Sequence, residues 1–227
     1  MPLHARSDIS GNMLIYILGA IFLLGLLIVL LKGSFQEGTG IDAEKVMMQA
    51  GELQRYGSEV ERGVGYILRD GYSESDLRFA NPNTTSYGLI TDTPQRQVFS
   101  ADGGGVEWRN PPTGSQAASA EWVFSGANAL TQIGSTCADK SCSDLLMVLP
   151  DITEALCTQI NRGHNISTTT GDPPAADNAL DLSTYFSSGV FTYAQTLEST
   201  EDALDAQAEG CFLMSGKYYY YRVLLAR

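Results

Sequence analysis

The chain has 227 residues, and its 26 acidic residues outnumber its 14 Lys and Arg residues to give a net charge of −12. A surface this acidic repels nucleic acid, so nucleic acid is not an expected partner. The chain has two histidines and lacks the G-x-S-x-G, H-E-x-x-H and phosphate-binding glycine motifs, so an enzyme is not expected.

A short polar leader, residues 1–11, precedes an apolar segment over residues 12–32. The chain carries no charge and no proline from Met13 to Leu31, and a helix over this run would be about 28 Å long, close to the thickness of a bilayer's hydrocarbon core. The run is longer than the apolar part of a secretory signal, which has about 7–15 residues. We therefore expect a retained transmembrane helix. The alternatives are a removed signal peptide and a buried helix of a soluble protein. The buried helix is disfavoured because it would need only one apolar side, whereas this segment is apolar on all sides.

A glycine-rich joint over residues 33–41 follows, and then an amphipathic stalk helix over residues 42–70, capped by Asp42. Its apolar positions recur at steps of three and four residues. They are Val46, Ala50, Leu53, Gly57, Val60, Val64 and Ile67. This face packs either on the chain's own head alone, as a core helix, or on the head while another face meets neighbouring subunits.

Residues 71–227 are expected to form an extracytoplasmic α+β head of a size that supports one core. Strand-like segments are expected at 86–91, 95–100, 105–110, 121–126 and 144–150. Asp151 is expected to cap a helix, and Ser215-Gly216 is the expected turn of a closing hairpin over residues 210–227. The predicted fold class is therefore α+β: an N-terminal apolar helix that continues into a long amphipathic helix, followed by a globular head with an antiparallel β-sheet.

Four consecutive tyrosines, Tyr218 to Tyr221, lie in the last expected strand. Successive side chains of a strand point to opposite faces, so two rings fall on each face. Either two rings fill the core and two lie flat on the sheet, or the exposed rings form a subunit interface.

All four cysteines follow the apolar segment, and their spacing fits no metal site. They indicate two disulfides in an oxidising compartment, with four buried free thiols as the alternative. Three pairings are open. We favour Cys137–Cys142, which closes a small loop, and Cys157–Cys211, which joins a helix to a late strand.

No cofactor is expected from the sequence, and calcium is the alternative because two loops are rich in carboxylates. Neither loop has the EF-hand spacing. The first loop carries Asp172, Asp177 and Asp181, and the second carries Glu198, Glu201, Asp202 and Asp205.

The leader that ends in Gly11, the apolar run that leads into an amphipathic helix, and the acidic, disulfide-linked head together resemble the type IV pilin and pseudopilin superfamily. The resemblance covers the first 70 residues well and the rest in outline. It implies that a prepilin peptidase cuts between Gly11 and Asn12, and that the apolar helix then leaves the inner membrane to form a filament core.

The resemblance further implies the residues of that core and the partners of the chain. The core residues would be Met13, Leu14, Ile15, Tyr16, Ile17, Leu18, Ile21, Phe22, Leu23, Leu24, Leu27, Ile28, Val29, Leu30 and Leu31. The partners would be other copies of the chain, in a helical homo-oligomer, and a pilus or secretion assembly machine. The head would lie in the periplasm first and on the cell surface after assembly.

The chain differs from the family pattern at two positions. The family usually has phenylalanine after the cut and glutamate at the fifth mature position, where this chain has Asn12 and Tyr16. These differences fit a minor or tip subunit, a divergent filament or a protein that is never cut. The expected function is a subunit of a pilus-like filament. The alternative is a permanently anchored single-pass membrane protein whose periplasmic head binds an envelope partner.

Overall fold

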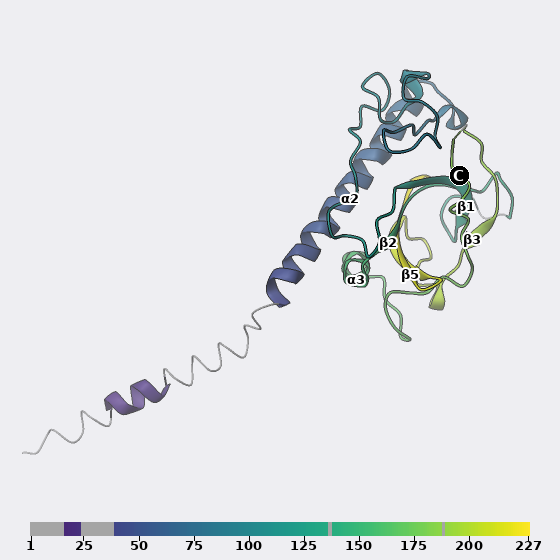
Figure 1. Cartoon of the computed structure of the whole chain (residues 1–227). Helices are drawn as coiled ribbons and strands as arrows, with labels where there is room; N and C mark the ends of the chain where they lie inside the picture. Colours follow the sequence, from purple (N-terminus) through teal and green to yellow (C-terminus); the bar gives the residue numbers. More distant parts are fainter. Residues whose placement is uncertain (1–15, 24–38, 136–137, 188) are drawn as a thin grey trace, which may run out of the picture. The chain divides into compact units, whose positions relative to one another are not determined.

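The computed structural model describes residues 16–23, 39–135, 138–187 and 189–227 (Figure 1). The chain divides into two compact units, Met1–Lys45 and Val46–Arg227, and each is described by itself. In the first unit, residues 16–23 are helical. The rest of the expected apolar helix lies outside the described residues.

Helix α2 runs from Thr39 to Arg69, so it begins within the segment predicted as a glycine joint. In the second unit, the apolar residues at steps of three and four are the ones that α2 buries: Leu53 and Val60 are fully inaccessible to solvent. Asp42 lies in the first turn and Arg69 in the last, and each charge is favourable there because of the helix dipole. Gly71 follows with φ of 95°, a conformation that glycine adopts without strain and that ends the helix.

The sheet has five strands in the order β3-β1-β2-β5-β4. The strands are β1 (Val123–Leu130), β2 (Asp144–Ile152), β3 (Gln195–Leu197), β4 (Glu209–Met214) and β5 (Lys217–Leu225). Strand β1 pairs in parallel with β3, whereas the other three pairs are antiparallel. The sheet curls around itself, as Figure 1 shows.

The predicted fold class was therefore wrong in two respects. The sheet is mixed, because the short strand β3 joins its edge in parallel with β1. In addition, no helix within the described ranges is both long enough and apolar enough to cross a membrane, so the long N-terminal apolar helix is not seen.

Three of the strand-like segments, 86–91, 95–100 and 105–110, form turns, the short 3-10 helix Pro94–Arg96 and irregular chain instead. Their apolar residues are still used, because Tyr87, Val98 and Val106 are buried in the core around α2. Backbone hydrogen bonds such as Val106 N–H to Val98 O replace a regular ladder.

Helix α3 runs from Glu154 to Gly163. Its N-cap is Thr153, whose side chain accepts a hydrogen bond from the backbone of Leu156, and not the predicted Asp151. The β2 strand continues through Asp151 to Ile152, which moves the start of the helix onward. The β4–β5 hairpin turns at Ser215 and Gly216, as predicted, and both residues have positive φ, as a tight two-residue hairpin requires.

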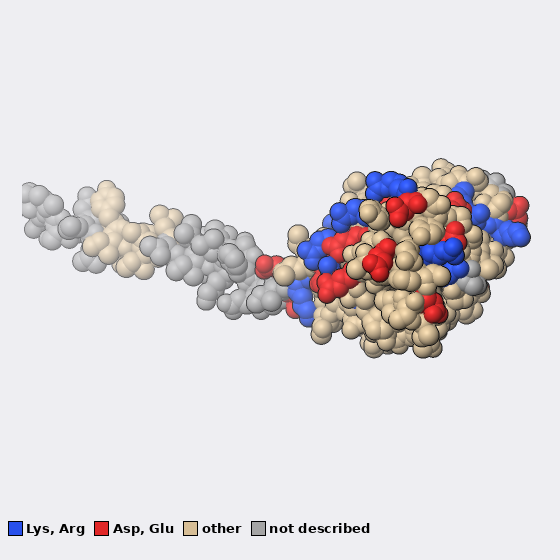
Figure 2. Space-filling view, turned by 90° about the horizontal axis from the view of Figure 1, so that it is seen from above, with Lys and Arg blue, Asp and Glu red and all other residues tan. Residues whose placement is uncertain are grey.

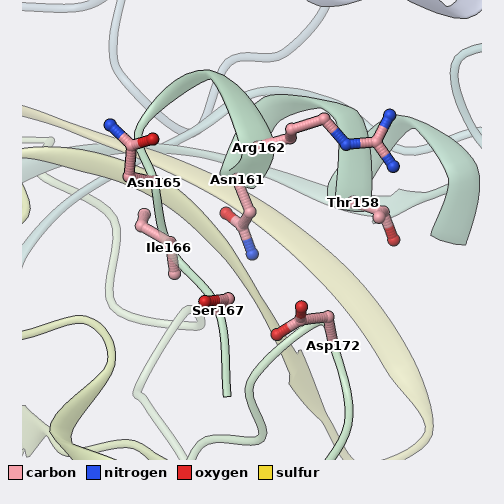
Figure 3. A pocket seen from close by; sticks show the side chains of 7 residues that line it. All are labelled: Thr158, Asn161, Arg162, Asn165, Ile166, Ser167 and Asp172. Atoms are coloured by element: carbon pink, nitrogen blue, oxygen red, sulfur yellow. The ribbon is translucent and has the colours of Figure 1, made fainter. Parts of the chain in front are cut away.

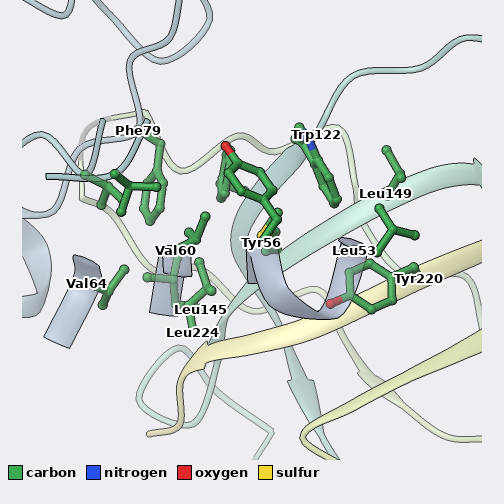
Figure 4. Close-up of a cluster of buried hydrophobic side chains, with 14 of the residues drawn as sticks. Leu53, Tyr56, Val60, Val64, Phe79, Trp122, Leu145, Leu149, Tyr220 and Leu224 are labelled. Atoms are coloured by element: carbon green, nitrogen blue, oxygen red, sulfur yellow. The ribbon is translucent and has the colours of Figure 1, made fainter. Parts of the chain in front are cut away.

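Two apolar cores cover the two faces of the sheet. The first lies under α2 and α3, and in Figure 4 Leu53, Tyr56 and Val60 of α2 pack toward Leu145 and Tyr220 of the strands. The second core lies on the opposite face, where the chain from Ile166 to Leu204 covers alternate residues of the same strands. Both faces of the sheet are thus covered by apolar cores of the head itself.

Candidate functional site

Six of the predicted filament-core residues lie in the described helix of the first unit. They are Tyr16, Ile17, Leu18, Ile21, Phe22 and Leu23. All six are exposed, with relative exposures between 53% and 72%. Large apolar side chains exposed together on one short helix usually mark a surface that contacts a partner or lipid.

The remaining predicted residues of this kind lie outside the described residues. They are the processing pair Gly11 and Asn12, and the core residues Met13, Leu14, Ile15, Leu24, Leu27, Ile28, Val29, Leu30 and Leu31.

The disulfide Cys157–Cys211 joins α3 to β4, as predicted, with 5.4 Å between the two Cα atoms. Asn161, one turn further along α3, fixes the same strand. Its side chain donates to the carbonyl of Cys211 at 2.9 Å and accepts from the N–H of Cys211 at 2.8 Å. Cys142 is buried and is not free, and its predicted partner Cys137 lies outside the described residues.

A buried polar network, which the sequence did not predict, attaches α2 to the last two strands. Its centre is Glu209 on β4, which receives hydrogen bonds from the hydroxyl of Tyr220 at 2.7 Å and from Nη1 of Arg222 at 2.6 Å. Arg222 also pairs with Glu61 of α2 at 2.7 Å. His164, beyond α3, lies 3.5 Å from Glu209.

Burial and charge shift two pKa values in this network. Burial, followed by the nearby carboxylate of Glu209, raises the pKa of the Tyr220 hydroxyl well above its ordinary value. Burial alone would lower the pKa of Arg222, but its bond to Glu61 and the charge of Glu209 outweigh this effect and raise it. The tyrosine therefore stays neutral and the arginine charged, so the network acts as a fixed structural joint.

A second buried carboxylate holds the C-terminus. Asp144, at the start of β2, accepts hydrogen bonds from the N–H groups of Leu130 at 2.8 Å and Arg227 at 3.0 Å. Burial raises its pKa from 3.8 to about 6, although these two hydrogen bonds act in the other direction.

The four tyrosines of β5 alternate between the two cores. Tyr220 packs in the core under α2, with Tyr218 against it, whereas Tyr219 and Tyr221 lie in the second core with Phe212. Tyr219, Tyr220 and Tyr221 are buried. The structure therefore buries three of the rings, where the core alternative had two in the core and two flat on the sheet, and only Tyr218 among the four stays partly exposed.

A cavity of about 310 Å³ lies between α3 and the chain that follows it. In Figure 3 the side chain of Asn161 points from α3 toward Asp172 in the chain that follows the helix, whereas Arg162 extends along α3. Asn161 is already bonded to Cys211, and Asp172 accepts a hydrogen bond from the N–H of Thr168 at 2.7 Å. The lining is polar, but Asn161 and Asp172 already form hydrogen bonds with other residues of the chain.

The two acidic loops lie side by side, since the N–H of Asp177 donates to the carbonyl of Glu198 and the N–H of Thr169 donates to the carboxylate of Glu201. Within the described ranges, no three His, Cys, Asp or Glu side chains are grouped as a metal site would require. The carboxylates of the loops instead accept hydrogen bonds from hydroxyl and backbone groups, such as Ser183 and Thr184 at Asp181.

Comparisons with protein-family models, with curated proteins and with solved structures give no match for this chain.

Proposed function

We propose that the chain is a structural subunit of a pilus-like filament, with its apolar N-terminal segment held in the inner membrane before assembly and its head outside the cytoplasm. The observation that carries the proposal is the exposure of six large apolar side chains between Tyr16 and Leu23. In water this surface is unfavourable, and lipid before assembly and other copies of the chain after assembly would cover it.

The energetics of burial favour a bundle of copies. Burying a large apolar side chain contributes roughly 1.5–3 kcal/mol, so the six described side chains would contribute roughly 9–18 kcal/mol before the entropic cost of association. Gly19 lies in the same helix and has no side chain, which permits the close approach of another helix. A neighbouring chain can therefore approach this helix closely.

The head has its own cores and a disulfide, which suit a domain outside the cytoplasm. Its two cores occupy both faces of the sheet, and its disulfide suits an oxidising compartment. The implied partners are other copies of the chain, a peptidase that cuts between Gly11 and Asn12, and an assembly machine. Both the cut and the machine follow from the resemblance to type IV pilins.

A pair of matched variants tests this proposal. Leu18→Lys places a charge in the apolar segment, and Leu89→Lys places the same charge at an exposed leucine of the head. Fibres sheared from cells and viewed by electron microscopy should disappear with Leu18→Lys and persist with Leu89→Lys. Fibres in both variants would refute a role for the apolar segment in assembly.

A permanently anchored protein whose head binds an envelope partner is the second candidate, and Tyr16 favours it, because the pilin pattern has glutamate there. In that case the chain keeps its leader, and detergent extracts all of it as small particles. Intact leader and complete extraction, with no fibres from wild-type cells, would establish this candidate in place of the filament.

A further inference from the structure

The outward side of α2 carries arginines at a regular spacing. Arg55, Arg62 and Arg69 are seven residues apart, so they lie along one face of the helix, and all three are exposed. Nε of Arg62 and Nε of Arg69 donate to carbonyls of their own helix, those of Ser58 and Gly65. Neither arginine forms an ion pair with any residue in the described part of the chain.

Arg62 and Arg69 line a groove of about 500 Å³ between α2 and the segment from Gly104 to Arg109. Glycines form much of its floor. A Cβ on Gly63 would lie 2.5 Å from Val106, whereas a Cβ on Gly65 or Gly105 would meet nothing within 4 Å. The groove is therefore closed at Gly63 by the side chain of Val106, whereas the backbone at Gly105 is open.

The third arginine of the groove is fixed in place. Arg109 pairs with Glu59 of α2 at 3.0 Å, and its guanidinium lies over the ring of Tyr56 at 5.5 Å from the centroid. Its Nη1 atom is nonetheless buried without a hydrogen-bond partner among the described residues. Arg62 and Arg69 are thus the exposed guanidinium groups of the groove that keep free donors, beside the carboxylates of Glu59 and Glu107 in the same lining, and such groups suit a carboxylate-bearing surface.

The same chain has such a surface. No Lys or Arg occurs between Arg162 and Lys217, whereas this stretch holds eight acidic residues. Figure 2 shows, in contrast, a face of the head on which both signs of charge lie interspersed. Asp177, Glu198 and Asp202 are exposed on the two acidic loops, and none of the three forms an ion pair within the described ranges.

The arginine groove and the acidic loops belong to opposite faces of the sheet. Helix α2 covers the first core, whereas Leu180, Leu197 and Leu204 from the acidic stretch cover the second. One copy therefore cannot bring its own loops to its own groove. A contact between unlike surfaces of two copies is heterologous, and such contacts repeat into rings or open filaments.

We propose that the arginine groove beside α2 binds the acidic loops of a second copy of this chain. The contact deepens the proposed function, because it gives the filament a lateral, salt-sensitive contact between heads. It also stands apart from the apolar segment, so it can be tested without fibres. Screening by salt weakens exposed ion pairs, so the contact is expected to be strong at low ionic strength only.

Charge exchange between two full-length variants tests the contact. The first carries Arg62→Glu with Arg69→Glu, and the second carries Asp177→Lys with Glu198→Lys. Sedimentation velocity in detergent at low salt should show self-association of the wild type and at least tenfold weaker association of each variant alone. The mixture of the two variants should associate again, because the acidic groove of one now meets the basic loops of the other.

Lys45→Glu with Lys140→Glu is the control, because both lysines are exposed and the change in net charge equals that of the groove variant, but neither residue lies in the groove or on the acidic loops. Association of this control should match that of the wild type. The proposal is overturned if the wild type stays monomeric at low salt, if the groove variant associates like the wild type, or if the mixture does not associate. If the groove variant forms the same fibres as the wild type, the contact is overturned and the proposed filament still stands.

Discussion

Arg222 of β5 forms ion pairs with two glutamates at once, Glu209 of β4 at 2.6 Å and Glu61 of α2 at 2.7 Å. The side chains of Arg222 and Glu209 are 17% and 10% exposed, whereas that of Glu61 is 46% exposed. Although the two ion pairs share one guanidinium, loss of the buried pair with Glu209 should lower the free energy of unfolding more than loss of the exposed pair with Glu61.

Replacement of Arg222 should be far more damaging than replacement of Glu61. Arg222→Ala leaves Glu209 buried without its cation, which costs about 3–5 kcal/mol. Glu61→Ala removes an exposed pair and should cost about 1 kcal/mol or less. Urea denaturation of the full chain in detergent measures both, and equal losses would show that the buried pair is not the dominant interaction.

The disulfide between Cys157 and Cys211 should contribute about 4 kcal/mol to the free energy of unfolding, because it closes a loop of 54 residues in the unfolded chain. The paired variant Cys157→Ala with Cys211→Ala should therefore unfold at a clearly lower urea concentration. Since Asn161 still holds β4, the variant should keep its far-UV circular dichroism spectrum. A midpoint like that of the wild type would contradict the prediction.

Asp144 gives a pH dependence whose sign follows from its raised pKa. Between pH 3.8 and about 6 the folded chain binds this proton and the unfolded chain does not. The stabilisation by the protonated group is therefore complete below pH 3.8 and is lost as the pH rises through about 6. The difference is at most about 3 kcal/mol, because solvent screening reduces the effect of the shift.

The comparison with Asp144→Asn isolates that contribution. The stability of the wild type relative to this variant should fall between pH 4 and pH 7, and NMR titration should place the pKa of the Asp144 carboxyl near 6. If the stability of the wild type relative to the variant stays constant or rises over this range, burial does not raise the pKa of Asp144 and the prediction is wrong.

Substitution by alanine should change stability in one direction at Gly51 and Gly65 of α2 and in the opposite direction at Gly57. A Cβ on Gly51 or Gly65 meets nothing within 4 Å, so Gly51→Ala and Gly65→Ala should each stabilise the helix by about 1 kcal/mol. A Cβ on Gly57 would lie 2.7 Å from Cδ of Arg222 and 2.7 Å from the hydroxyl of Tyr220. Gly57→Ala should destabilise the head, and a stabilising effect would show that the joint between α2 and β5 yields easily.

The parts of the fold that the sequence predicted depend on local patterns. The buried face of α2 follows from the spacing of Leu53, Val60 and Val64, which is a property of one helix. The β4–β5 hairpin follows from Ser215-Gly216, since φ values of 52° and 79° there are what the turn requires.

The parts that the sequence did not predict depend on distant partners. The three residues of β3 are too few for a pattern, and they pair with β1, which lies far earlier in the chain. The segment 105–110 has strand-like residues, but α2 and not a neighbouring strand covers it, so Val106 is buried without a ladder. The network likewise joins Glu61, Glu209 and Arg222 from three elements, and no local signal marks them.

The mass of the chain recovered from sheared surface fibres tests the central claim most directly. The filament proposal predicts that the sheared fraction contains this chain and that its intact mass corresponds to a start at Asn12. A chain that is absent from the sheared fraction and keeps Met1 in the membrane fraction would contradict the proposal.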